Sequence, residues 1–415
     1  MRVAIVTEHR FVRTPSGVFT SGPFAYSFWK RYLAVFDSVR VVARAAGPDG
    51  FPPGAAAGGL APVARADGPG VSLAPLPYYR GPQQCFWGVR RIRQAIEASF
   101  NQNDAIILRL PSVLAFLAAG WLRRSGRPFA VEVVGDPWDA LAPGAHGHPL
   151  RALFRQVLAR SQRRQCAASC ASSYVTRLAL QRRYPASPGT LAVGCSDVEL
   201  PYSAFVEQPR PAPGAPRQPT LVTVGSLNHF YKAQDVLLEA LARCHRNGLD
   251  ASLVIVGDGQ YRPALESRSR LLGIRERVVF CGQLACGEAV RRELDRADLF
   301  VLPSRQEGLP RALLEAMARG LPAIGSTAGG IPELLAAEDL IPPNDPICLA
   351  NKIEEVFRNP ARLERMSRRN LTRAWEYEES LLGNQRTLFL AGVRLETERW
   401  VGRGQRAGLP ARSAA

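Results

Sequence analysis

The residues best suited to chemistry in this 415-residue chain are one lysine and two glutamates in its second half. Lys232 follows the glycine-bearing end of an apolar run, in the stretch LVTVGSLNHFYKAQD. The chain holds only three lysines among 53 basic residues, so arginine is its usual cation. A lysine ammonium is a compact charge suited to a phosphate. An ordinary surface lysine is the alternative interpretation.

The two glutamates lie in the stretch LFVLPSRQEGLPRALLEAMARG (299–320). A buried strand should run to Ser304, followed by a loop that holds Glu307 and then by a helix that holds Glu315. The free N–H groups of such a helix start bind anions, and Gly308 allows close approach of the backbone to a ligand. Sugar or ribose hydroxyl groups could donate to the carboxylates. The alternative is a glutamate favoured by the helix dipole and a routine helical glutamate.

The elements that position these residues follow a pattern that occurs twice along the chain. Short apolar, β-branched runs alternate with helical patterns, which indicates parallel sheets covered on both faces. We therefore predict an α/β fold with two doubly wound, Rossmann-like domains. The predicted strands are 3–8, 39–44, 105–111, 130–136, 166–175, 221–227, 252–259, 278–284, 299–304 and 322–326.

The domain boundary lies near the proline-rich stretch EQPRPAPGAPRQP, whose composition is typical of an extended linker. Residues 46–70, rich in Ala, Gly and Pro, should form a long surface loop. The predicted parts are an N-terminal acceptor-side domain (1–200), the linker (201–219), a ligand-binding domain (220–374), C-terminal helices that cross back to the first domain (375–402) and a disordered tail (403–415).

Composition limits the classes of partner. A net charge of +17 favours anionic partners such as nucleic acid, acidic lipid or phosphorylated small molecules, although an arginine-rich coding bias would have the same effect. No zinc spacing, helix-turn-helix signal or aromatic RNA-binding motif accompanies this charge, so we expect no nucleic acid partner. Eight scattered cysteines fit a reducing cytoplasm. The longest apolar window, 113–122, is too short to span a bilayer.

Residues 221–335 resemble the donor-binding domain of family 4 glycosyltransferases, which are retaining enzymes of the GT-B fold and include bacterial polysaccharide and glycoconjugate transferases of group 1. Two Rossmann-like domains face each other across a cleft in this fold. The resemblance rests on V-G-S-L…Y-K (224–232), V-I-V-G-D-G (254–259), E-G-L-P-R-A-L-L-E-A-M-A-R-G-L-P (307–322) and G-S-T-A-G-G-I-P-E-L (325–334).

The resemblance implies a role for each chemical residue. It places Lys232 on the donor diphosphate, Glu307 on the transferred sugar and Glu315 on the ribose hydroxyls. Many relatives carry arginine where this chain has Ser226, and Arg305 or Arg311 could supply the missing charge. The residues expected to bind the donor are Gly22, Gly225, Ser226, Lys232, Gly257, Gln283, Leu284, Glu307, Gly308, Leu309, Arg311 and Glu315.

The first half matches the family more loosely. Gly22 directly precedes an expected helix and would lie by the donor phosphates, although a turn glycine is equally consistent. Many relatives carry a histidine after the strand that here ends in Gly135-Asp136; this chain has His146 and His148 only further on. We expect Asp136 to take that polar role, so the predicted catalytic residues are Lys232, Glu307 and Asp136.

The expected reaction is retaining transfer of a sugar from a UDP- or GDP-linked donor to a glycan, lipid-linked or small-molecule acceptor, without metal or cofactor. Basic stretches at 78–93 and 151–164 could dock on an anionic membrane, which would make the protein cytoplasmic and peripheral at the inner face of the plasma membrane. A solvated arginine face is the alternative there. Two other functions stay open: a nucleotide-sugar 2-epimerase-like isomerase, and a degenerate, non-catalytic binding protein.

Overall fold

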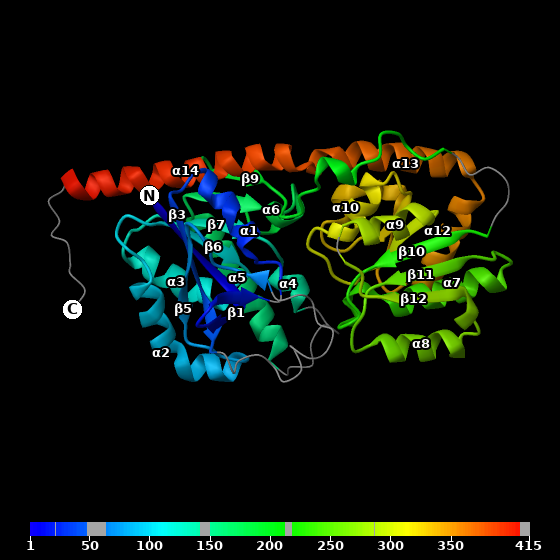
Figure 1. The fold of residues 1–415 in the computed structure, drawn as a ribbon, viewed down its shortest axis with the longest axis horizontal. Coiled ribbons are helices and arrows are strands. Elements are labelled where there is room, and N and C mark those ends of the chain that lie inside the picture. Colours follow the sequence, from blue (N-terminus) through cyan, green and yellow to red (C-terminus); the bar gives the residue numbers. More distant parts are fainter. Residues whose placement is uncertain (21, 48–63, 142–149, 212–217, 286, 407–415) are drawn as a thin grey trace. The chain divides into compact units, whose positions relative to one another are not determined.

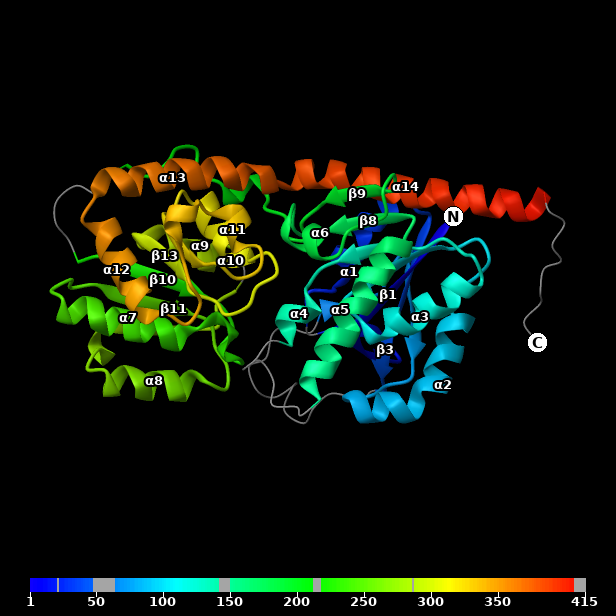
Figure 2. The same cartoon turned by 180° about the vertical axis from the view of Figure 1, so that it is seen from behind.

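A computed structural model describes the chain except for residues 21, 48–63, 142–149, 212–217, 286 and 407–415. The chain divides into two compact units. The first unit comprises Met1–Pro137, Leu153–Cys195 and Gly383 onward, and the second comprises Trp138–Ala152 and Ser196–Leu382. Most of the predicted loop 46–70, part of the linker, and His146 and His148 lie outside the described residues, as does the end of the predicted tail. Figures 1 and 2 show the elements from opposite sides.

The sheet of the first unit is parallel along most of its width. Parallel pairs run in the order β5-β3-β1-β6-β7-β8-β9, and β2 and β4 add antiparallel pairs at the far end of β1. The strands are β1 (Arg2–Thr14), β2 (Gly17–Thr20), β3 (Ser38–Ala46), β4 (Ala64–Arg65), β5 (Val71–Leu76), β6 (Ala105–Leu110), β7 (Ala130–Val133), β8 (Ala171–Tyr174) and β9 (Leu191–Gly194).

Two apolar cores cover the two faces of this sheet. Because side chains alternate along a strand, Val3 and Ile5 of β1 enter one core, while Ala4 and Val6 enter the other. Phe389 of the terminal helix packs in the first of these cores. The helices are α1 (Tyr26–Lys30), α2 (Pro82–Ala98), α3 (Val113–Arg124), α5 (Arg151–Ala168), α6 (Ala179–Arg183) and α14 (Glu379–Arg406), of which α5 and α14 extend into both units.

The sheet of the second unit is parallel throughout, in the order β12-β11-β10-β13-β14-β15. Apolar cores lie on both faces, with Leu221 and Val222 of β10 in opposite ones. The strands are β10 (Thr220–Val224), β11 (Ser252–Val256), β12 (Val278–Gly282), β13 (Leu299–Leu302), β14 (Ala323–Ser326) and β15 (Leu340–Ile341). The helices are α4 (Pro137–Ala140), α7 (Gln234–Arg246), α8 (Arg262–Leu271), α9 (Glu288–Arg296), α10 (Arg311–Ala318), α11 (Ile331–Leu334), α12 (Pro346–Phe357) and α13 (Pro360–Ala374).

This strand order creates a switch point between β10 and β13. The chain builds the sheet outward from β10 through β11 to β12, and then returns to place β13 on the opposite side of β10. The helices that follow β10 and β13, α7 and α10, pack against opposite faces of the sheet. In open α/β sheets, ligands bind at such a switch point, outside the carboxyl ends of the strands. Lys232 and Glu307 follow these two strands.

The prediction of two doubly wound α/β sheets is confirmed, with local corrections. The predicted strand 166–175 is wrong at its start, because α5 continues to Ala168 and buries Cys166 before β8 begins at Ala171. The sequence pattern missed β5, whose run VSLAPL contains Pro75 and follows a glycine- and proline-rich stretch. Helix α14 extends to Arg406, into the predicted tail. No helix in the described part of the chain is long and apolar enough to cross a membrane.

Candidate functional site

Lys232 and Glu307 meet at the switch point of the second sheet. Lys232 ends a short 3-10 turn after β10, and Glu307 lies in the loop after β13. Lys232 Nζ donates to Glu307 Oε1 at 2.6 Å, and Ser304 Oγ donates to the same oxygen at 2.7 Å. Both charged side chains are largely buried, with exposed fractions of 15% for Lys232 and 6% for Glu307. The fold thus holds a cation and an anion together at the edge of the sheet where ligands bind.

Two of the predicted glycines hold this lysine in place indirectly. A Cβ added at Gly225 would lie 3.2 Å from Lys232 Cγ, so the glycine leaves room for the lysine stem. At Gly257, φ is +135° and an added Cβ would lie 2.0 Å from the Gly225 carbonyl oxygen. The ends of β10 and β11 therefore approach too closely for a side chain at Gly257.

The loop after β14 supports the Glu307 backbone. Gly329 has a φ of +54°, and a Cβ added there would lie 2.0 Å from the carbonyl oxygen of Glu307. The Gly330 N–H donates to the Gly308 carbonyl at 2.8 Å, and Ser326 Oγ donates to the Ser304 carbonyl at 2.6 Å. The stretch GSTAGG therefore positions the Glu307 loop through backbone contact.

Glu315 lies on α10, whose start faces the same loop. Pro310 is the N-cap rather than the first helical residue, and no side chain within the described ranges caps this start. Burial raises the pKa of Glu315, and the nearby positive charges of Arg311 and Arg291 oppose that effect. The Arg311 guanidinium lies 3.9 Å from the Glu315 carboxylate and is itself exposed. The open helix start offers N–H donors to an anion. The Glu315 carboxylate is largely desolvated by burial.

The structure distinguishes the two arginines that could compensate for Ser226. Arg305 is bound to Asp235 through two hydrogen bonds, of 2.8 and 2.7 Å, and also to the Phe230 carbonyl. It thereby ties the loop after β13 to the start of α7. Among the described residues, Arg311 has only its 3.9 Å approach to Glu315, so it is the better candidate for a second cation. Ser226 Oγ accepts from the Asn228 N–H at 3.2 Å, within its own turn.

The other predicted residues of this unit lie along the same edge of the sheet. Gln283 and Leu284 follow β12, two strands from β10. The Gln283 side chain is exposed and donates to the Leu284 carbonyl at 3.3 Å. Leu284 and Leu309 are partly buried against the apolar core on that face. Their assignment to the donor stays a prediction.

In the first unit, Asp136 follows β7 and is already engaged. Its carboxylate accepts from Arg183 Nη1 and, at 2.5 Å, from the Tyr184 hydroxyl. Its side chain is only 9% exposed. Such an ion pair anchors α6 to the end of β7, which is a structural task. The catalytic assignment of Asp136 stays a prediction, and these bonds favour a positioning role instead.

Gly22 lies beside a histidine that sequence reasoning missed. The Gly22 N–H donates to Thr20 Oγ1 at 2.9 Å, and His9 Nε2 lies 2.6 Å from the same oxygen. Burial, helped by the positive charges of Arg44 and Arg10, lowers the pKa of His9 to about 4. The expected helix directly after Gly22 is wrong, because α1 begins at Tyr26, after Pro23 and an extended Ala25. A histidine directly after the predicted strand 3–8 was the available signal, although β1 in fact continues to Thr14.

Comparisons with known proteins agree with this geometry. Residues 218–359 match the family described as Glycosyl transferases group 1. The match spans the switch point with Lys232, Glu307 and Glu315, and the predicted assignment as a glycosyltransferase is confirmed.

One relative extends the likeness to most of the chain, and a second covers less than half of it. Protein CapJ of Staphylococcus aureus is 25% identical over 379 residues, which cover 91% of this chain and 89% of CapJ. The alpha-D-kanosaminyltransferase of Streptomyces kanamyceticus is 31% identical over 189 residues, covering 44% of this chain and 47% of that enzyme.

Solved structures show the GT-B fold. Sucrose-phosphate synthase of Thermosynechococcus elongatus aligns with a TM-score of 0.66 at 18% identity, over 94% of this chain and 99% of that one. Anabaena HepE, in complex with UDP, aligns with a TM-score of 0.64 at 16% identity, over 94% of this chain and all of that one. The predicted fold is therefore confirmed.

Proposed function

We propose that this glycosyltransferase moves a sugar, with retention at the anomeric carbon, from a UDP-linked donor to a growing glycan or lipid-linked acceptor. The observation that carries the proposal is the Lys232–Glu307 pair at the switch point, next to the uncapped start of α10. The UDP and UDP-glucose bound to Anabaena HepE support a uridine nucleotide, although two mycobacterial relatives are named as GDP-mannose-dependent.

The proposed chemistry needs a cation where the nucleotide leaves. The bond between the anomeric carbon and the diphosphate oxygen breaks, a bond to the acceptor oxygen forms, and the acceptor hydroxyl passes its proton to the departing diphosphate. Negative charge grows on the diphosphate, and Lys232 with the α10 N–H groups would stabilise it. Glu307, once Lys232 turns to the diphosphate, keeps its bond from Ser304 and accepts from sugar hydroxyls. Glu315 accepts from the ribose. We propose that no resident metal takes part.

The test is calorimetric titration with UDP, GDP, TDP and ADP, on the unaltered protein and on Lys232→Ala and Glu315→Ala. Lys352→Ala is a matched control, because Lys352 lies on α12 and pairs with Glu355. We expect UDP to bind best and only the first two variants to lose it. Equal binding by all variants contradicts the proposed donor site. The anomeric configuration of the product, read by NMR, decides retention.

The acceptor proposal rests on relatives that build surface polysaccharides. Residues in this chain are 31% identical over 170 positions to the Escherichia coli protein named putative colanic acid biosynthesis glycosyltransferase WcaL, with 39% of this chain covered. The comparisons do not favour the isomerase or the non-catalytic alternative.

We further propose that α2 brings the protein to the inner face of the plasma membrane. Phe86 and Trp87, in its first turns, are 72% and 86% exposed. Arg90, Arg91 and Arg93 follow on the same helix and are largely exposed. Exposed aromatic side chains next to basic ones favour an anionic lipid surface. Flotation with vesicles containing phosphatidylglycerol should therefore capture the protein, and Phe86→Ser with Trp87→Ser should abolish capture.

A control separates this effect from general apolar exposure. Leu271, at the end of α8, is 89% exposed. Arginines lie beside it, but α8 contains no aromatic residue. Leu271→Ser should leave flotation unchanged. Capture that survives the double variant on α2 contradicts the membrane proposal.

A further inference from the structure

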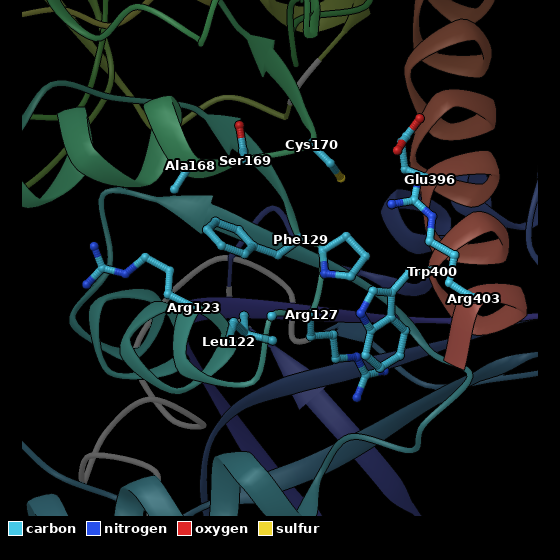
Figure 3. Close-up of a pocket in the computed structure, with 12 residues that line it drawn as sticks. Leu122, Arg123, Arg127, Phe129, Ala168, Ser169, Cys170, Glu396, Trp400 and Arg403 are labelled. Carbon is cyan, nitrogen blue, oxygen red and sulfur yellow. The ribbon is translucent and has the colours of Figure 1, made fainter. Parts of the chain in front are cut away.

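A pocket of about 380 Å³ lies in the first unit, away from every residue considered so far. It is formed by the end of α3, the residues that enter β7, the junction between α5 and β8, and the last turns of α14 (Figure 3). The volume falls in the range of small-molecule sites. Its principal lining residues are Arg123, Arg127, Phe129, Cys170, Trp400 and Arg403.

The pocket lies at the edge of the sheet opposite to the one used by substrates. Arg127 and Phe129 immediately precede β7, and Cys170 immediately precedes β8. These strands are parallel, so the pocket is at their amino ends. Substrates of open α/β sheets bind at the carboxyl ends. A ligand in this pocket would therefore be separate from the transferase reaction.

The charge of the pocket is positive and not balanced by ion pairs. Arg123, Arg127 and Arg403 line it, and none of the three forms an ion pair with a carboxylate in the described part of the chain. Glu396 is the acidic lining residue, and it already accepts from Arg399 at 2.6 Å. Elsewhere on α14, Arg394 pairs with Glu398 at 2.9 Å. Three arginines without an ion pair among the described residues thus line one cavity, with a single acidic residue in its lining.

Arg127 is the buried member of the set. It is only 6% exposed, and its Nη2 donates to the Asp104 carbonyl at 2.7 Å and to the Asn101 carbonyl. Its Nε has no partner within the described part of the chain. Burial lowers its pKa to about 10, against the nearby charge of Asp104. A buried guanidinium held by neutral carbonyl groups favours an added anion nearby.

A flat apolar surface completes the site. The Trp400 ring centroid lies 5.7 Å from the Arg127 guanidinium carbon, and Phe129 lines the pocket floor. Figure 3 shows Arg123 and Arg403 on opposite sides of the pocket, with the Trp400 indole beside Arg127. Burial, with the negative charge of Glu396, raises the pKa of Cys170 to about 12, so its thiol adds no negative charge.

We propose that this pocket binds a small phosphate monoester that carries a flat ring, with the ring on Trp400 and the phosphate between Arg127 and the two exposed arginines. The exposed side chains of Arg123 and Arg403 can turn toward the phosphate, because neither is held by an ion pair among the described residues. Such a ligand would link the end of α14 to α3 and to the start of β7.

The test is calorimetric titration of the full chain with phenyl phosphate, with phenol and inorganic phosphate as half-probes. UDP is present in excess, to keep the probe out of the proposed donor site. We expect a dissociation constant below about 1 mM for phenyl phosphate and weaker binding of both half-probes. Arg403→Gln and Arg123→Gln should each weaken binding roughly tenfold, as expected for the loss of a charge-assisted contact. Trp400→Leu should weaken phenyl phosphate but not inorganic phosphate.

Arg124→Gln is the matched control, because Arg124 is exposed in the same turn of α3 but does not line the pocket. It should leave the affinity unchanged. Arg127→Gln is not decisive, since it also removes bonds that hold two main-chain carbonyls. Absence of binding at about 10 mM probe overturns the proposal. So does binding that is equal in Arg124→Gln and Arg403→Gln. Binding of the probe that is seen without UDP and lost when UDP is added also overturns it.

Discussion

The Nζ atom of Lys232 and the Oε1 atom of Glu307 lie 2.6 Å apart, although 75 positions separate the two residues in the chain. They follow β10 and β13, strands that are neighbours only because the chain reverses its direction across the sheet. In the ligand-free protein the ammonium is therefore already paired. A diphosphate bound as we propose would have to compete with Glu307 for it, while the Ser304 hydroxyl still donates to that carboxylate.

Replacement of Lys232 should damage both turnover and stability. Lys232→Ala removes the proposed donor to the leaving diphosphate, so we expect kcat to fall at least about 100-fold. It also leaves Glu307 largely buried with the Ser304 bond alone, which should cost about 1–3 kcal/mol of unfolding free energy. Steady-state kinetics and urea unfolding measure the two effects.

Lys232→Arg separates charge from shape. A planar guanidinium does not fit as a compact ammonium does in the space that Gly225 leaves for the side chain. We therefore expect kcat to stay low, while the unfolding free energy recovers in part. Turnover restored to that of the unaltered protein by arginine would contradict the role given to the ammonium.

Gly329→Ala should impair catalysis without touching a substrate. The added Cβ would meet the Glu307 carbonyl oxygen at 2.0 Å, so the Glu307 loop must shift. Gly248→Ala is the matched control, because Gly248 also has a positive φ, of +92°, but an added Cβ there meets nothing within 4 Å. Both variants should lose about 1 kcal/mol to backbone strain. Only Gly329→Ala should lower kcat by tenfold or more, and equal kcat values would contradict the contact.

Glu315 should make nucleotide binding depend on pH. Burial raises its pKa in the folded, ligand-free protein, and only the ionised carboxylate accepts two bonds from a ribose diol. UDP affinity should therefore weaken as the pH falls through this raised pKa. Binding should release protons there, which titrations in buffers of different ionisation enthalpy detect. Glu315→Gln should bind more weakly at neutral pH and lose this pH dependence; an unchanged slope would exclude Glu315 as its source.

Glu315 should also make the unfolding free energy of the ligand-free protein fall as the pH rises. Because the folded-state pKa of Glu315 lies above the unfolded-state value, the unfolded chain releases the proton first, and stability falls with rising pH through that interval. Glu315→Gln should therefore be more stable than the unaltered apo protein at neutral pH. Calorimetric melting of both proteins between pH 4 and pH 7 provides the comparison.

His9, in the first unit, should make the unfolding free energy fall as the pH decreases. Its pKa is about 4 in the folded protein, below its ordinary value of 6.5, so the folded state favours the neutral ring. The stabilising contribution of the neutral His9 ring is fully present above pH 6.5. It is lost as the pH falls towards 4, by up to about 3 kcal/mol. His9→Gln keeps an acceptor for Thr20 but does not titrate. Its melting temperature should fall less steeply over this range, and parallel pH curves would contradict the prediction.

Much of the fold could be predicted because it depends on local pattern. The continuous apolar strands and their alternation with helices predicted both sheets, and a lysine in an arginine-rich chain identified one end of the site. The pattern did not identify β5, because Pro75 and the preceding glycines resemble a loop. It also assigned Cys166 to a strand, since small apolar residues suit a buried helix end and a buried strand equally.

The sequence by itself determined which residues could do chemistry: Lys232 after one strand, and Glu307 and Glu315 around one helix start. Only the tertiary structure decided how they are used. Strand order places Lys232 against Glu307; close backbone packing explains Gly257 and Gly329; and ion pairs commit Asp136 to Arg183 and Arg305 to Asp235. Such pairings depend on contacts between residues far apart in the chain, and spacing along a single sequence carries no information about them.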